Sequence, residues 1–230
     1  MAAASLIAQV LEANRALPAH GLAPLTWGNA SGIDRDTGHV VIKASGVAYE
    51  AMAEGDMVVV DLDGNVVAGD KRPSTDTPTH LVLYRAFEEI GAVVHTHSTW
   101  SVTWAQAQRH IPLLGTTHAD LCACPIPVTR ALTDEEIASD YEGATGNTLV
   151  EVITERGPLE LPCALVRGHG PFCWAETPAK AVDVAVTLEQ VARMALLTTL
   201  LEPDAPPLQS ALRDKHYERK HGPQAYYGQP

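Results

Sequence analysis

The sequence predicts an α/β or α+β protein in which helices cover a central β-sheet. Short β-branched runs such as VVIKAS and MVVVDL interleave with longer segments that carry helix-start signals. The chain has 230 residues, 46% of them apolar, which is enough to bury a sizeable core. Because no repeat or linker-like stretch divides it, we expect a single domain over residues 1–230.

The N-terminal third of the chain is expected to form a helix and then several strands. The first helix covers about residues 3–16, and Pro18 and Gly21 are expected to end it. The segment DGN at 63–65 has the composition of a hairpin turn between two strands. The strands expected here lie at 40–45, at 57–62 and near 66.

Helix-start signals recur through the rest of the chain. Ser74–Asp76 are good capping residues, and Thr133 with Glu136 forms a capping box. Thr177 followed by Pro178 is typical of an N-cap and the first helical position. The expected helices lie at about 77–89, 99–108, from 134, 178–201 and 209–220, with strands at 93–97 and 164–170.

Composition and charge exclude several classes of protein. A formal net charge of −12 argues against general nucleic-acid binding, which needs a basic surface. The N-terminal segment lacks a basic region before its apolar residues, and we expect no apolar segment long enough to span a membrane. The cysteines show no disulfide framework, so we expect free thiols, a cytoplasmic location and a structural role for Cys122 and Cys124.

Three histidines have the context of metal ligands. His95 and His97 lie two residues apart on an expected strand, so both rings would face the same side. His169 follows an apolar strand in GHGP, where a turn can direct a side chain into a cleft. Three neutral imidazoles form a zinc-like divalent site, with Asp76 as a fourth candidate. Ordinary core histidines, and a helix cap at Asp76, remain open alternatives.

A second set of residues offers hydrogen-bond donors for an anion. Lys43 supplies an ammonium group, and Gly46 lets backbone N–H groups approach a ligand closely. Ser74 and Thr75 precede an expected helix, whose N-terminus favours anions. The alternative is that these residues only form turns and a cap. The full set of candidate phosphate-binding residues is Asn29, Lys43, Ser45, Gly46, Ser74 and Thr75.

Seven segments occur in an order that resembles a known family. They are TWGNAS, IKASG, PSTDTPTH, VHTHS, GTTHAD, HGPF and the terminal DKHYERKHG followed by AYYGQ. Together they resemble the class II aldolase/epimerase family, and the similarity runs from the first helix to the last few residues. One departure is Thr75, where relatives carry Ser, but the hydroxyl group is retained.

The resemblance implies a fold, a cofactor and an assembly. The fold is a three-layer α/β/α arrangement around a largely antiparallel sheet. His95, His97 and His169 would hold one divalent metal ion per subunit, with Asp76 at or next to it. Zn²⁺ is the first choice, and Mn²⁺ or Co²⁺ are alternatives. The chain would form a fourfold-symmetric homotetramer with sites between subunits, and its tail at about 221–230 would reach a neighbouring site.

The resemblance also implies a pair of acid/base groups. Epimerisation at C4 of a 2-ketopentose 5-phosphate cannot remove the C4 hydrogen directly, because that carbanion would be unstabilised. Breaking and re-forming the C3–C4 bond avoids this, and it requires proton transfer on both faces of the aldehyde. Asp120 and Tyr227 are the implied pair, although a turn carboxylate and a packed or frayed tail are the alternatives. Possible further contacts are Thr116, His118, Glu142 and His216.

The expected activity is metal-dependent conversion of L-ribulose 5-phosphate to D-xylulose 5-phosphate, an isomerase reaction on a sugar phosphate. One alternative is an aldolase of the same family, which would release the cleaved fragments. Aldolases of this family typically carry Glu at the position of Asp76, which favours the epimerase. The other alternative is a non-catalytic member that acts as a binding module. Neither nucleic acid nor membrane is an expected partner.

Overall fold

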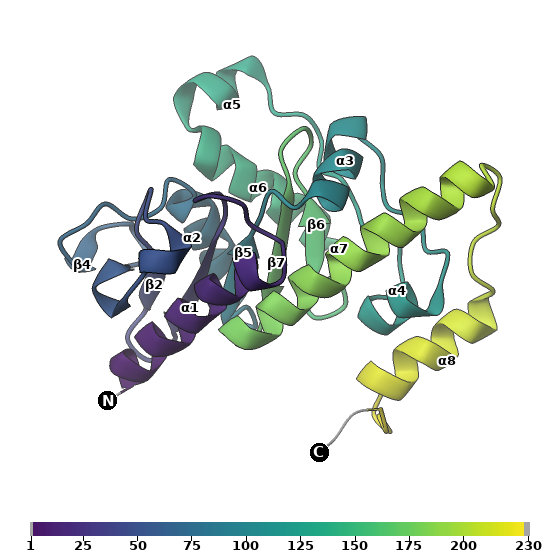
Figure 1. Cartoon of the computed structure of the whole chain (residues 1–230), viewed down its shortest axis with the longest axis horizontal. Coiled ribbons are helices and arrows are strands. Elements are labelled where there is room, and N and C mark those ends of the chain that lie inside the picture. Colours follow the sequence, from purple (N-terminus) through teal and green to yellow (C-terminus); the bar gives the residue numbers. More distant parts are fainter. Residues whose placement is uncertain (1, 228–230) are drawn as a thin grey trace.

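The central strand β1 (Asn29–Asp34) belongs to a seven-stranded sheet in the computed structural model, which describes residues 2–227 (Figure 1). The strand order is β4-β3-β2-β1-β5-β7-β6, and every neighbouring pair runs antiparallel. The antiparallel sheet confirms the predicted fold class. The other strands are β2 (His39–Lys43), β3 (Met57–Val60), β4 (Val66–Ala68), β5 (Ala92–His95), β6 (Cys163–Leu165) and β7 (Pro171–Ala175).

Helices cover both faces of this sheet, which gives the expected three layers. On one face lie α1 (Ala2–Ala19), α3 (Thr99–Ala107) and α7 (Pro178–Leu201), with α1 against β1 and α7 against β5 and β7. On the other face, α2 (Thr77–Ala86) packs on α6 (Tyr141–Thr154). The remaining helices are α4 (Thr116–Leu121), α5 (Asp134–Ser139), α8 (Ser210–His221) and the short 3₁₀ turns Tyr49–Ala51 and Glu54–Asp56.

The two faces of β1 carry different chemistry. A Cβ atom at Gly32 would lie 2.9 Å from a side-chain carbon of Leu6, so glycine lets α1 lie close to the sheet. On the opposite face, the Ser31 hydroxyl contacts both His80 Nδ1 and Tyr84 Oη at 2.7 Å. Since side chains alternate along a strand, Asn29 shares the face of Ser31 and lies toward α2. The polar face of this strand therefore leads to the candidate site.

The sequence analysis missed some elements and misplaced the ends of others. Strands β1 and β7 and helices α4 and α6 were not predicted, because NASGID and PFCWA lack the β-branched runs that mark strands. Helix α1 continues to Ala19 and contains Pro18, with the adjacent Leu17 buried. Helix α2 ends at Ala86, because Phe87 is extended. At Leu17 and in strands β1 and β7, burial outweighed the local signals.

Several local predictions were confirmed. The side chain of Thr177 accepts a hydrogen bond from Lys180 N, and α7 begins at Pro178 as expected. Thr133 and Glu136 form the predicted capping box at the start of α5. The antiparallel pairing of β3 with β4 confirms the hairpin, and α3 and α8 begin within one residue of their expected positions.

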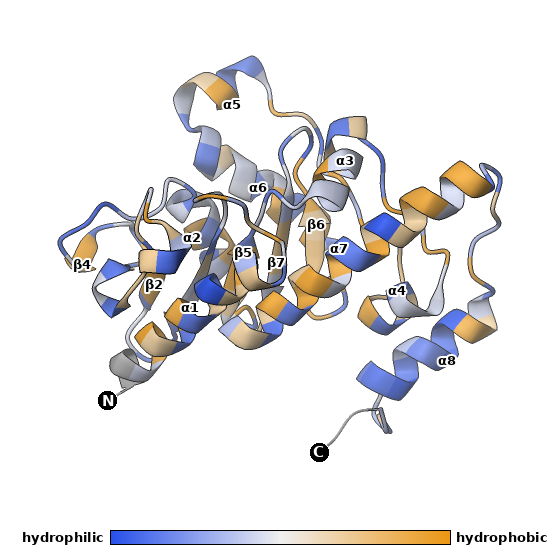
Figure 2. Cartoon of the chain, in the orientation of Figure 1, coloured by the Kyte–Doolittle hydropathy of each residue, from blue (hydrophilic) through white to orange (hydrophobic). Residues whose placement is uncertain are grey.

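Helix α7 corrects one expectation. By length and apolar composition it could span a membrane, whereas the sequence analysis expected no such segment. In this structure its inner side is buried at Val182, Leu188 and Val191. Its C-terminal end instead exposes apolar surface, with Leu200 70% and Leu201 88% exposed, and Figure 2 shows this end coloured as hydrophobic. The helix is thus a core element with one uncovered apolar end.

Candidate metal and substrate site

Three imidazoles meet at the end of β5, as the sequence predicts. The possible ligand atoms of His95, His97 and His169 lie within 4.8 Å of one another. The Nε2 atoms of His95 and His97 are 3.0 Å apart, and the ring centroids of His95 and His169 are 4.7 Å apart. His97 lies two residues beyond the strand end, so the expected strand was too long, yet the rings still converge. This arrangement fits a three-histidine metal site.

The orientation of His95 is set by its neighbours. Its ring stacks on Phe172 with centroids 4.2 Å apart, on the adjacent strand β7. Its Nδ1–H donates to the carbonyl oxygen of Pro171 at 2.9 Å, which leaves Nε2 with a lone pair facing His97. Gly170 permits this packing, because a Cβ there would lie 2.7 Å from Thr96 O. The ring is therefore prepared to present Nε2 as a ligand.

Burial keeps these histidines in the form that binds metals. Burial lowers the pKa of His95 to about 3, and it also lowers the pKa of His97 and of His169. All three rings are consequently neutral near pH 7, with lone pairs available. The donor set thus fits a divalent ion in both chemistry and protonation state.

Asp76 occupies the N-cap position of α2, but its side chain makes no capping hydrogen bond. Instead, Asp76 Oδ2 accepts a hydrogen bond from Asn29 Nδ2 at 2.6 Å. Burial alone would raise the pKa of Asp76, but the nearby His95 and His80 and the bond from Asn29 outweigh it and lower the pKa. The carboxylate is therefore ionised at the edge of the imidazole cluster. The alternative that its side chain caps the helix is wrong in this structure.

The predicted phosphate-binding residues line the same cavity as the metal candidates. This cavity has a volume of about 400 Å³. Asn29 Nδ2 also donates to Ser74 Oγ at 3.0 Å, which joins the two sets of residues. The lining comprises Thr26, Trp27, Gly28, Asn29, Lys43, Ser45, Gly46, Ser74, Thr75, Asp76, His97, Tyr141, Glu142 and His169. One cavity thus brings together a metal-type cluster and an array of donors.

Lys43 is the clearest sign that this cavity accepts an anion. The residue is only 2% exposed, and burial lowers its pKa. Its ammonium group lies 3.4 Å from Thr26 O and 5.1 Å from the ring centroid of Tyr49. Among the described residues it forms no ion pair with a carboxylate. A buried cation without an ionic partner is costly, and a phosphate group would supply one.

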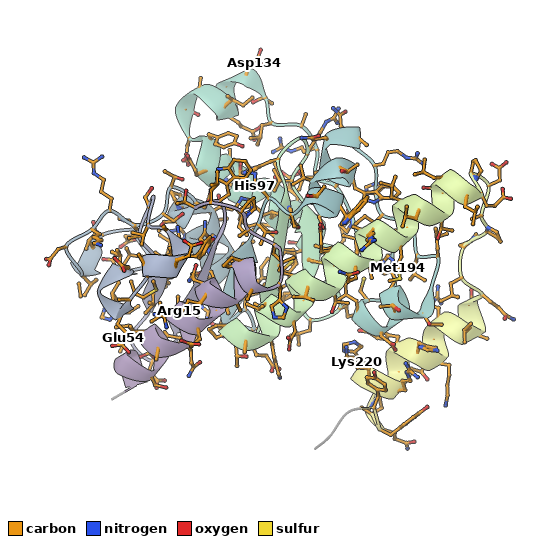
Figure 3. All side chains as sticks on the ribbon, in the orientation of Figure 1. Arg15, Glu54, His97, Asp134, Met194 and Lys220 are labelled. Carbon is orange, nitrogen blue, oxygen red and sulfur yellow. The ribbon has the colours of Figure 1, made fainter. Side chains whose placement is uncertain are left out.

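Asp120 and Tyr227 lie elsewhere in the chain. Both line a separate cavity of about 440 Å³, together with Lys220, and it shares no lining residue with the metal cavity. Figure 3 shows His97 and Lys220 far apart. Arg219 donates to both carboxylate oxygens of Asp120 at 3.1 and 2.8 Å, and its guanidinium lies over the Tyr227 ring. Within one chain, these two residues do not join the histidine cluster.

Of the four lower-priority candidates, only Glu142 lies in the metal cavity. His216 Nδ1 lies 3.1 Å from Asp120 Oδ1, so it belongs to the other end. His118 is buried, with Nε2 3.0 Å from Cys124 O, and Thr116 is the first residue of α4. The cysteines of the described chain are all free and buried: Cys122, Cys124, Cys163 and Cys173.

Several residues in and around the metal cavity were not among the sequence candidates. Tyr141 Oη lies 3.2 Å from His169 Nδ1, and Trp27 lines the cavity with its ring 6.2 Å from that of His97. His80 is fully buried between Ser31 and Phe172. The only available signals were the positions of Trp27 and Tyr141, which lie next to Gly28 and Glu142. Such adjacency does not distinguish them from ordinary aromatic residues.

Comparison with known proteins identifies the family. Residues 8–196 match the model of the Class II Aldolase and Adducin N-terminal domain, and the chain belongs to this family. A relative from Salmonella paratyphi A, named L-ribulose-5-phosphate 4-epimerase UlaF, is 53% identical over 221 residues, covering 96% of this chain and 97% of the relative. A relative of the same name from Salmonella typhi is similar to the same extent.

Solved structures agree on the fold. An L-fuculose 1-phosphate aldolase superposes with a TM-score of 0.80 at 22% identity, covering 94% of this chain and 95% of that one. The L-fuculose 1-phosphate aldolase from Glaciozyma antarctica PI12 gives a TM-score of 0.77 at 18% identity, covering 94% of this chain and 81% of that one. At these identities the structures support the class II aldolase fold alone.

Proposed function

We propose that the chain is an L-ribulose-5-phosphate 4-epimerase, which converts L-ribulose 5-phosphate to D-xylulose 5-phosphate. The observation that carries this is one cavity in which His97 and His169 of the three-histidine cluster lie with Lys43, whose ammonium forms no ion pair among the described residues. That cavity matches a substrate with a phosphate at one end and oxygen atoms able to bind a metal at the other. The 53% identity to relatives with this name, over nearly the whole chain, supports the same assignment.

One divalent ion would be held by His95, His97 and His169, with Asp76 beside it. The neutral imidazoles and the ionised carboxylate fit such an ion, and Zn²⁺ is the first choice for three nitrogen ligands. When bound, the ion would supply Lewis-acid stabilisation of the negative charge on the enediolate fragment. Mn²⁺ and Co²⁺ are the alternatives.

The substrate phosphate would be bound by the donors at the other side of the cavity. Lys43 would provide the charge, and the hydroxyl groups of Ser45, Ser74 and Thr75 would add hydrogen bonds. Gly46 has a φ of +71°, which a side chain would strain, and it leaves the backbone open to the ligand. Binding the phosphate here would anchor the aldehyde fragment while its carbonyl group turns about the intact C4–C5 bond to present the opposite face.

Asp120 and Tyr227 would transfer the protons. One group would take the proton from the C4 hydroxyl as the C3–C4 bond breaks, and the other would return a proton on the opposite face of the rotated aldehyde. Because these residues line a different cavity within one chain, we propose that a neighbouring copy delivers them to the metal cavity. The tail at about 221–230 would take part, although residues 228–230 lie outside the described structure.

A homotetramer would provide such shared sites. The exposed apolar end of α7 supports self-association, since Leu197, Leu200 and Leu201 lie uncovered close to the α4 and α8 end of the chain. We also propose that the chain acts as a single domain in the cytoplasm, which its free cysteines support. Neither a membrane nor a nucleic acid is part of the proposed function.

The deciding experiment incubates the metal-loaded protein with L-ribulose 5-phosphate and follows D-xylulose 5-phosphate. The proposal expects a steady approach to an equilibrium mixture of the two pentose phosphates. Stoichiometric release of glycolaldehyde phosphate and dihydroxyacetone would favour the aldolase alternative. Absence of turnover in a metal-replete sample would favour a non-catalytic binding module.

A further inference from the structure

Tyr141 contacts one of the three clustered histidines directly. Its phenol oxygen lies 3.2 Å from Nδ1 of His169, and the two ring centroids are 6.2 Å apart. Tyr141 also lines the cavity that holds the phosphate-binding candidates. The residue has no part in the proposed proton transfers, so the contact requires a separate explanation.

Which ring nitrogen of His169 carries the proton determines whether the contact with Tyr141 favours or prevents metal binding. A neutral imidazole carries its proton on one nitrogen and a lone pair on the other. If Tyr141 donated to Nδ1, the proton of the ring would lie on Nε2 and block it as a ligand. If Nδ1–H donates to the phenol oxygen, Nε2 keeps its lone pair. His95 has the corresponding arrangement, because its Nδ1–H donates to Pro171 O at 2.9 Å.

The backbone around Tyr141 is well anchored. Tyr141 is the first residue of α6, and the preceding Asp140 caps this helix by accepting a hydrogen bond from Gly143 N at 3.2 Å. Thr145 Oγ1 donates to the carbonyl oxygen of Tyr141 at 2.8 Å. The phenol group is therefore carried by a helix end of defined geometry, not by a free loop.

The same helix end is bound to the helix that carries Asp76. Thr79 Oγ1 on α2 donates to Glu142 O at 2.7 Å. A Cβ atom at Gly146 would lie 2.7 Å from Val82 Cβ, so glycine allows α6 and α2 to pack closely. The positions of Tyr141 and Asp76 are consequently coupled through one helix pair.

We propose that Tyr141 is a positioning residue of the metal site, which accepts a hydrogen bond from His169 Nδ1–H and so keeps Nε2 free for the ion. This inference rests on the proposed three-histidine site and adds a residue to it. Partners of this kind commonly change metal affinity by about 10–100-fold when they are removed.

The test compares metal binding by the metal-free wild type, Tyr141→Phe and Tyr217→Phe. Zn²⁺ affinity is measured by competition with a chromogenic chelator, and Co²⁺ is added to record the visible absorption of the site. Tyr141→Phe should weaken Zn²⁺ binding by about 10–100-fold and alter the Co²⁺ spectrum. Tyr141 is 37% exposed, so removal of its hydroxyl group should leave the fold intact, and circular dichroism checks this.

Tyr217→Phe is the matched control, because it removes the same kind of phenol oxygen from a residue on α8 that stacks on His221 and does not line the metal cavity. It should bind Zn²⁺ within twofold of the wild type. Tyr141→Phe binding within twofold of the wild type, or an equal loss in both variants, would overturn the proposal. Failure of the wild type itself to bind Zn²⁺ would instead reject the underlying metal site.

Discussion

The metal cavity and the Asp120 end differ in how complete they are within one chain. In the metal cavity, His95 is fully buried, and its ring is held by Phe172 and Pro171. At the other end, Asp120 is ion-paired with Arg219, and Tyr227 is 57% exposed. The first region thus has its chemical groups aligned, whereas the second holds Asp120 half-buried in an ion pair and leaves Tyr227 exposed.

This difference indicates which chemical groups of the proposed reaction each copy of the chain supplies. A cluster that must bind a cation needs burial and fixed lone pairs, which one chain provides by itself. A proton-transfer group must reach both substrate and solvent, and a surface position near an uncovered apolar helix end permits this. If the two regions also differ in function, substitutions at the Asp120 end should leave metal binding unchanged.

The largest effect is expected from His95→Ala. The remaining two imidazoles make a poor site, so the variant should lose most of its metal and its activity together. Elemental analysis of the folded, purified variant measures the metal content. His20→Ala is the control, since His20 is exposed near the end of α1 and should change neither property. Stoichiometric metal retained by folded His95→Ala would remove His95 from the site.

Tyr227→Phe should slow turnover by roughly 10²–10⁴-fold while metal content stays unchanged, because only an acid/base group is lost. The matched control is Tyr226→Phe, which removes the neighbouring phenol; Lys215 lies over the Tyr226 ring at 5.3 Å. Steady-state kinetics on metal-loaded protein measures the effect. If both variants lose activity equally, the tail acts through packing and not through Tyr227.

Mixing inactive variants tests whether the two regions meet across an interface. Tyr227→Phe and His95→Ala carry defects at opposite ends, so some interfaces in a mixed assembly would join an intact metal cavity to an intact Tyr227. Activity should return to about a quarter of the wild-type level after random exchange of equal amounts, since each half-site is intact with probability about one half. Confirmed exchange without recovery would contradict the shared site.

Lys43→Met should weaken substrate binding without altering metal content. A charge-assisted contact contributes roughly 1.5–3 kcal/mol, which corresponds to a factor of about ten to a hundred and fifty in affinity. Inhibition by inorganic phosphate provides the measurement. Lys71→Met is the control, because that ammonium already pairs with Asp56. Equal inhibition of Lys43→Met and the wild type would place Lys43 outside the phosphate pocket.

As the pH falls, the first loss of folding stability should come from the buried histidines on the metal side. Burial lowers the pKa of His95 to about 3 and that of His80 to about 4, below the usual value near 6.5. Above pH 6.5 these histidines are neutral in both the folded and the unfolded chain. Below it the unfolded chain binds protons that the folded chain does not, so folding stability falls as the pH approaches those values. Each fully buried histidine then costs up to about 1.4 kcal/mol per pH unit.

The loss is measured as the free energy of chemical unfolding of the metal-free protein at pH 7, 6 and 5. Burial alone would raise the pKa of Asp120, but bonds from Arg219 and His216 lower it, so its contribution persists until the pH falls below about 4. Asp120→Asn should therefore lower the free energy of unfolding at pH 7 without changing how steeply that free energy falls between pH 7 and 5. A flat wild-type profile over this range would contradict the prediction.

Local signals predicted much of the fold, and long-range packing decided the rest. The capping box at Thr133 and the start of α7 at Pro178 depend on hydrogen bonds within one helical turn, so a short stretch of sequence specifies them. Strand β1 has no such signal. Its serine and glycine become buried because α1 and α2 cover opposite faces of the sheet.

In the candidate site, too, some features were indicated by the local sequence and others depended on tertiary contacts. The spacing of His95 and His97 and the turn at His169 made a metal cluster one of two interpretations of the sequence, and ordinary core histidines were the other. The convergence of the three rings in the structure favours the cluster. Only the tertiary structure decided that Asp76 bonds Asn29 instead of capping its helix, that Tyr141 lies against His169, and that Asp120 is held by Arg219. These contacts join residues separated by 28 to 99 positions, and no local pattern encodes which distant side chains packing will bring together.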